Sequence, residues 1–182
     1  MKQLVISALA CFLPAAPTHA GDQAFDGWLT IAPRDEIRPA FSFDPEGGPS
    51  KGGSCTVTRD QREGLDGGFQ KSYPVTGGEG FRSHAIRQTR NVAVPRRSAL
   101  ARALGQDAEG RMVPADVPAR QSEELGHIPS AEPEFPTDGA SDAQGWTTVD
   151  GVYRVPAKAT RAIVELHLQW APNGQVEWSE VE

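Results

Sequence analysis

Cysteine is scarce in this chain, with only two among its 182 residues. Cys11 lies in an N-terminal stretch that we expect to be removed, so the remaining chain has no partner with which Cys55 could form an internal disulfide. The surrounding sequence, Ser54–Thr58, is rich in β-forming residues. This favours a small buried strand residue at position 55 over a reactive or intermolecular thiol.

Basic residues are fewer than acidic ones, and long apolar runs are absent from the sequence. The chain has 18 Lys and Arg against 24 Asp and Glu, which gives a formal net charge of −6. An acidic surface without a basic stripe argues against binding to nucleic acid or to anionic membranes. The N-terminal apolar run, Leu4–Leu13, is too short to cross the roughly 30 Å of hydrocarbon in a bilayer.

The N-terminus has the pattern of a secretory signal peptide. Lys2 precedes the apolar run, and Thr18 and Ala20 place small residues before a cleavage point after Ala20. We expect residues 1–20 to be removed and 21–182 to be exported, to the periplasm or the cell exterior, as a single domain without membrane insertion. A lipid anchor on Cys11 is disfavoured, because Ala8 stands where such signals usually have leucine.

Glycine and proline are abundant, at 34 residues spread along the chain, and they break helices and supply turns. The clearest strand is Ala162–Trp170, where apolar and polar residues alternate strictly. This alternation places Trp170 in the core. Asn173-Gly174 then predicts a hairpin to a strand at Gln175–Val181.

Further short strands are predicted on both sides of a long central loop, at Phe25–Ile31, Ala40–Asp44, Ser54–Arg59, Gly80–Gln88, Ser98–Leu104 and Trp146–Val155. The Ser98–Leu104 segment has helix-forming composition and is assigned to a strand by its context. We expect a bulge at Asp150-Gly151, although this pair is also a hairpin signal. The long loop, Arg111–Ala143, is either functional or disordered. The sequence therefore predicts an all-β fold, a two-sheet antiparallel jelly-roll β-sandwich with one long loop.

Several segments resemble a known family: Gly67–Lys71, Pro74–Ser83, Gly145–Val149, Tyr153–Ala159 and Gly174–Val181. Together they look like jelly-roll carbohydrate-binding modules of the galactose-binding-like fold. The strongest similarity is to the β-sandwich domain that precedes the catalytic domain of some exported bacterial carbon–nitrogen (nitrilase-type) hydrolases, notably at Asn91–Ser98 and Ala159–Gly174. The resemblance covers Trp28–Val181 and implies a non-catalytic module. Because the sequence stops one residue after Val181, we expect either a stand-alone module or a truncated hydrolase.

Modules of this kind bind sugars on a sheet face or at loop tips, through exposed aromatic rings and polar side chains. The candidate glycan-binding residues are Glu165, His167 and Gln169 on the polar face of the central strand, Arg82 and His84 if Gly80–Gln88 joins the same sheet, and Trp146. The competing interpretation is an ordinary solvated sheet face.

The resemblance also implies a structural calcium held by acidic residues near the end of the last strand. Here that pair is Ser179-Glu180, so Glu180 is the candidate metal ligand. Catalysis is not expected, since the histidines lack zinc-site spacing, Gly-x-Ser-x-Gly is absent, and Cys55 lacks nitrilase-like surroundings. Two functions remain open: a module that binds a glycan or cell-surface polymer, and a structural domain that positions a partner hydrolase.

Overall fold

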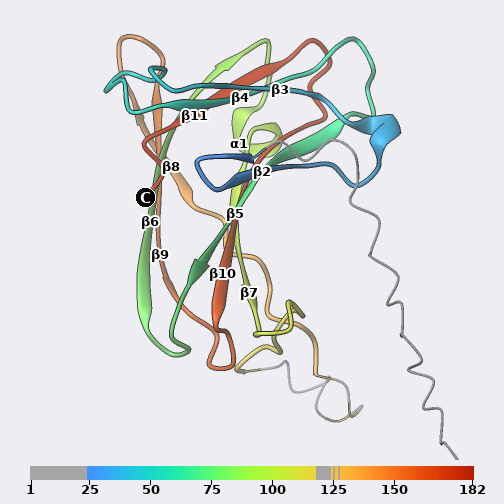
Figure 1. Ribbon diagram of the computed structural model, residues 1–182, viewed down its shortest axis with the longest axis vertical. Coiled ribbons are helices and arrows are strands. Elements are labelled where there is room, and N and C mark those ends of the chain that lie inside the picture. Colours follow the sequence, from blue (N-terminus) through green and yellow to red (C-terminus); the bar gives the residue numbers. More distant parts are fainter. Residues whose placement is uncertain (1–23, 118–123, 125, 127) are drawn as a thin grey trace, which may run out of the picture.

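The computed structural model describes residues 24–117, 124, 126 and 128–182 of the chain. Two antiparallel β-sheets hold almost all of the regular secondary structure of this part, and they pack on one another around a common core (Figure 1). The predicted all-β sandwich is confirmed. The expected signal peptide and His127 lie outside the described residues. No helix in the described part combines the length and apolar character needed to cross a membrane.

The first sheet has five strands. In spatial order these are β1 (Ala24–Phe25), β2 (Trp28–Ile31), β5 (Asp66–Pro74), β10 (Arg161–Gln169) and β7 (Ala101–Gln106). β10 lies between β5 and β7 and pairs with both, so side chains of three strands meet on each face around it.

The second sheet has six strands. In spatial order these are β3 (Ala40–Asp44), β4 (Ser54–Thr58), β11 (Gln175–Ser179), β6 (Gly80–Arg90), β9 (Thr147–Arg154) and β8 (Thr137–Ser141). The described part also contains a 3₁₀ turn, η1 (Asp35–Ile37), and a short helix, α1 (Pro95–Ser98).

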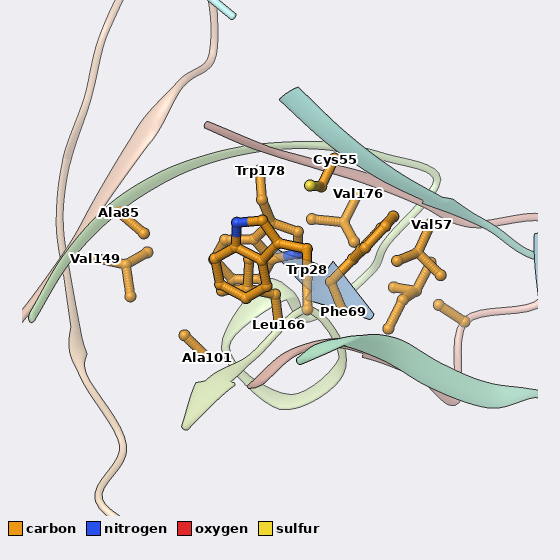
Figure 2. Close-up of a cluster of buried hydrophobic side chains, with 13 residues drawn as sticks. Trp28, Cys55, Val57, Phe69, Ala85, Ala101, Val149, Leu166, Val176 and Trp178 are labelled. Carbon is orange, nitrogen blue, oxygen red and sulfur yellow. The ribbon is translucent and has the colours of Figure 1, made fainter. Parts of the chain in front are cut away.

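The core forms where the inner faces of the two sheets meet. Figure 2 shows Trp28, Phe69 and Leu166 of the first sheet close to residues of the second sheet such as Val176 and Trp178. All five are buried, and each contributes about 1.5–3 kcal/mol through removal of its apolar surface from water. Trp178, whose side the alternation left undecided, is therefore a core residue.

The prediction that Cys55 is a small buried strand residue is confirmed. It lies on β4 beside the core tryptophans and is almost inaccessible to solvent. Burial raises the pKa of its thiol to about 12.

The alternation along β10 is confirmed up to Gln169 and fails at the next residue. Leu166 and Leu168 point into the core and are fully buried, whereas Trp170 is 58% exposed. Trp170 has a positive φ of 52°, so the backbone leaves the strand there and the two-residue period no longer applies. The prediction that Trp170 lies in the core is wrong.

The Asn173-Gly174 turn also differs from its prediction. The turn exists, with Asn173 at φ 57° and the Gly174 amide donating to the Ala171 carbonyl at 2.8 Å. However, β10 belongs to the first sheet and β11 to the second, so the turn carries the chain across the core and is not a hairpin. A turn signal defines a reversal of the chain, but it does not define which strands then pair.

Three other segments differ in detail from the predicted elements. The first predicted strand is divided by a turn at Asp26-Gly27 into β1 and β2. Only Ala101–Leu104 of the segment Ser98–Leu104 is strand, because Pro95–Ser98 is helical. The long loop contains an unpredicted edge strand, β8, which pairs with β9.

β9 itself runs through Asp150-Gly151 without a hairpin, as expected. Its pairing with β6 continues in register through both residues, so the expected bulge is not present in that ladder. The register shift lies instead between β8 and β9, at Asp138 and Ser141.

Candidate functional site

A network of polar side chains lies on the outer face of the first sheet, centred on Glu165. The strand register places Glu165 directly opposite Gln70 on β5 and Arg102 on β7. Its carboxylate accepts hydrogen bonds from Gln70 Nε2 at 2.8 Å and from Arg102 Nε at 2.5 Å. A third contact, at 3.0 Å, comes from Nε2 of His167, two residues along the same strand. Three neighbouring strands are thus joined through one carboxylate.

The electrostatics of this network favour an ion pair. Burial would raise the pKa of Glu165, but the hydrogen bonds from His167 and Arg102 outweigh burial and hold it at about 2. Burial would likewise lower the pKa of His167, but its contacts with Asp66 and Glu165 raise it above the ordinary value of 6.5. A negative Glu165 and a positively charged His167 stabilise one another.

The network is buried, contrary to the interpretation as a solvated sheet face. Glu165 is 6% exposed and His167 is 5% exposed. The more accessible polar groups form the rim, and they include Arg102 and Asp66, the latter 3.4 Å from His167 Nδ1. β10 is central in its sheet, so long side chains on both neighbouring strands cover its outward residues. Glu165 and His167 therefore hold the rim in place, and the rim groups face solvent.

An exposed aromatic ring adjoins this face at the end of β10. Gln169 Nε2 donates to the Arg97 carbonyl oxygen at 3.2 Å, and the Arg97 guanidinium lies 5.2 Å from the centre of the Trp170 ring. This contact is a cation–π interaction, which holds both side chains at the surface. The sequence analysis did not include Trp170 among the candidate site residues, because the alternation placed it in the core. The only available signal was its place three residues before Asn173-Gly174, where strand alternation can end.

The remaining candidate residues lie elsewhere. Arg82 and His84 belong to β6 in the second sheet, so the condition for grouping them with Glu165, a shared sheet, is not met. Both contact Asp150 on β9, at 3.4 Å and 2.8 Å respectively. Trp146 is half-buried in the turn between β8 and β9, where its amide donates to Asp142 at 2.8 Å.

Glu180, the candidate calcium ligand, follows β11 and has a positive φ of 51°. In the part of the chain that the structure describes, no group of three or more His, Cys, Asp or Glu side chains is arranged to hold a metal ion. Calcium prefers six to eight oxygen ligands, with several carboxylates among them. Among the described residues, Glu180 is not part of such a cluster of side chains, and the expected calcium stays a prediction.

Comparisons by sequence identify no relative: no protein-family model matches the chain, and no protein of established function matches it. Solved structures do match. One is the enzymatically active domain of tailspike protein 4 from bacteriophage CBA120, with a TM-score of 0.58 and 13% identity over 86% of this chain. Another holds the CBM22-1 and GH10 modules of a Clostridium thermocellum xylanase complexed with xylohexaose, with a TM-score of 0.53 and 12% identity over 87% of this chain.

This chain spans only 19% and 26% of the length of those two proteins. A third matching structure is close to this chain in length. The CBM22-1 xylan-binding domain from Paenibacillus barcinonensis Xyn10C has a TM-score of 0.50 and 12% identity, and the match covers 88% of this chain and 86% of that domain.

The fold is carbohydrate-binding-module-like. At these identities the matches establish the architecture, in agreement with the jelly-roll resemblance noted in the sequence. The finer resemblance to the β-sandwich domain of nitrilase-type hydrolases stays a prediction.

Proposed function

We propose that this protein is an exported, non-catalytic glycan-binding module whose site is the outer face of the first sheet. The observation that carries this proposal is the exposed Trp170 ring beside the ordered polar network of β5, β10 and β7. The matched xylan-binding domain supports it by showing that this architecture serves glycan binding elsewhere.

Trp170 supplies the apolar contact that the proposal needs. Sugar rings present C–H groups on their faces, and a large aromatic ring buries them while retaining few degrees of freedom. Arg97 lies over the indole and restricts it before any ligand arrives. A ring that is already ordered loses less conformational entropy on binding, so more of its contact energy remains as affinity.

The rim of the polar network supplies contacts for sugar hydroxyls. Arg102 and Gln169 can donate hydrogen bonds to the oxygen of a sugar hydroxyl, and Asp66 can accept one from its hydrogen. The side chains of Glu165 and His167 are already hydrogen-bonded to one another, and Glu165 is also hydrogen-bonded to Gln70 and Arg102. In this proposal they are positioning residues that fix Arg102 and Asp66, and they do not contact the sugar themselves.

Binding of the secreted protein to a panel of polysaccharides, followed by titration calorimetry with the best ligand, tests the proposal. We expect Trp170→Ala to weaken binding by roughly thirtyfold or more, as for a buried aromatic anchor. Trp146→Ala, in the turn between β8 and β9, and Arg82→Gln, on β6, are matched controls away from the first sheet, and we expect each to leave the affinity within about twofold of wild type.

Other outcomes would point elsewhere. Loss of binding in Trp146→Ala or Arg82→Gln, with Trp170→Ala unaffected, would move the site to the second sheet. A folded protein that binds no glycan would contradict the proposal and favour the alternative, a structural domain that positions a partner hydrolase.

A further inference from the structure

A second feature is a cavity whose lining includes Arg97, the residue that also contacts the Trp170 ring. This cavity, of about 330 Å³, opens between α1 and the segment 135–136. Its walls include three arginines, Arg87, Arg96 and Arg97, and the aromatic ring of Phe135, which is 47% exposed. We call this cavity the arginine pocket. Its volume is at the lower end of the range of about 300–1,000 Å³ found for ligand sites.

The arginine pocket carries excess positive charge. Arg87 is buried and forms an ion pair with Asp138 at 2.5 Å, and Arg96 lies 3.7 Å from the other oxygen of the same carboxylate. Among the described residues, Asp138 is the only carboxylate within ion-pairing distance of these three guanidinium groups. Because arginine stays protonated, the single negative charge of Asp138 is outnumbered by the three positive charges of the arginines. The pocket is therefore positive, although the protein as a whole has a formal net charge of −6.

Hydrogen bonding at the base of the pocket leaves one buried donor unused, Nε of Arg87. Arg87 donates to the Ala99 carbonyl oxygen and to Asp138, but its Nε has no hydrogen-bond partner among the described residues. A buried cationic group with an unsatisfied donor makes its surroundings favourable for an anion. The buried arginine thus adds a fixed positive charge behind the two accessible ones.

The arginine pocket is continuous with the proposed glycan-binding face. Arg97 belongs to both, since it lines the pocket and lies over the Trp170 ring. Its backbone is held by Gln169 of β10. A polymer lying on Trp170 would therefore place a neighbouring residue over Arg96 and Arg97, with Phe135 as a second exposed ring.

We propose that the arginine pocket binds the carboxylate of a uronic acid residue, so that the ligand class is an acidic polysaccharide. The inference rests on the proposed glycan-binding function and specifies its ligand. The planar guanidinium fork matches a carboxylate with two parallel hydrogen bonds, which gives geometric selectivity as well as attraction. Arg96 and Arg97 supply these forks, and Trp170 and Phe135 contact the sugar rings.

Single-stranded nucleic acid is the main rival ligand, because arginine and exposed aromatic rings also bind stacked bases. Such proteins guide the phosphate backbone along an extended positive groove. Here three arginines line a single pocket, in a chain whose formal net charge is −6, so repulsion from the acidic surface disfavours a ligand with closely spaced phosphates. One acidic group per few sugar residues suits a single pocket better.

The test compares glucuronoxylan, whose carboxylates are widely spaced, with polygalacturonate and alginate, which carry one carboxylate on every sugar. Each is measured beside its carboxyl-reduced neutral form, at low and at high sodium chloride. We expect at least one acidic polymer to bind about tenfold or more tightly than its neutral form, as for charge-assisted hydrogen bonds, with a preference that weakens in salt. Arg96→Gln/Arg97→Gln should abolish the preference. Arg97→Lys should retain part of it through charge alone. Arg34→Gln, at an exposed arginine distant in sequence, should leave it unchanged.

The outcomes separate the inference from the proposed function. Equal binding of acidic and neutral polymers would overturn the inference and leave the glycan-binding function standing. No binding to any polymer by the folded protein would overturn both. Tighter binding of dextran sulfate or of single-stranded DNA, with the same sensitivity to the double variant, would show a general anion site and overturn the assignment to uronic acids.

Discussion

His167 and Glu165 form a buried ion pair on one face of β10, with 3.0 Å between Nε2 and Oε2. The pair lies on the outer face of a sheet, where charged side chains are usually solvated. Arg102 and Gln70 complete its hydrogen bonds from the two neighbouring strands. This arrangement makes the candidate site rigid, and it also makes the site important for stability.

Glu165→Gln tests the role of this carboxylate in stability. The change removes the only negative charge in contact with Arg102 among the described residues and leaves His167 with a weaker partner. Breaking a buried charge pair from one side costs about 3–5 kcal/mol, so we expect a loss of that size in urea unfolding. Glu177→Gln, at a half-buried position on β11, is the control. A change no larger than that of the control would show that the network contributes little.

The pH dependence of stability follows from the same pair. The pKa of His167 is raised above 6.5, so its contribution is fully present below pH 6.5 and is lost as the pH rises through the raised value. The pKa of Glu165 is lowered to about 2, so its contribution is present above about pH 4.5 and is lost as the pH falls towards 2. Both contributions are complete only between these limits.

Thermal melts at pH 5.5 and pH 8.5 check this prediction. We expect a lower melting temperature at the higher pH in the wild type, and a smaller difference in His167→Gln. His84→Gln, which removes a histidine from the second sheet, should retain the wild-type difference. An equal pH effect in wild type and His167→Gln would assign the dependence to other groups.

Cys55 should be chemically inert in the folded protein. Burial raises its thiol pKa to about 12, so the reactive thiolate is about one part in ten thousand at pH 8. We expect iodoacetamide to leave Cys55 unmodified in native buffer and to alkylate it fully in guanidinium chloride, as read by mass spectrometry. Rapid modification of the native protein would show that β4 opens locally.

Packing of the hydrophobic core is tested at Leu166, which is fully buried between the sheets on the inner face of β10. Leu166→Ala leaves a cavity that the surrounding strands cannot fill, and it should cost about 2–5 kcal/mol in unfolding free energy. Val152→Ala, at an exposed position on β9, should change stability by no more than about 0.5 kcal/mol. Similar effects of the two changes in denaturant unfolding would contradict the packing described for the core.

Local sequence patterns determined much of the fold. Alternation along Ala162–Gln169 identified β10 and its inward face, because the two-residue period of a strand is set by the backbone alone. Turn residues located the chain reversals for the same local reason. The edge strand β8 was missed because Thr137–Ser141 is short and almost wholly exposed, so it carries no apolar alternation.

The candidate site depended on features that no local pattern contains. Alternation placed Glu165, His167 and Gln169 on one face of the strand. The pairing of β10 with β5 and β7 brought Gln70 and Arg102 beside them, and Glu165 and His167 are buried as a result. The crossing after β10 placed β11 in the other sheet, and the positive φ at Trp170 turned that ring to the surface. Strand neighbours are selected by packing over the whole core, between residues far apart in the chain. The sequence by itself therefore determined the strands and their faces, and only the tertiary structure decided which faces meet and which aromatic ring remains exposed.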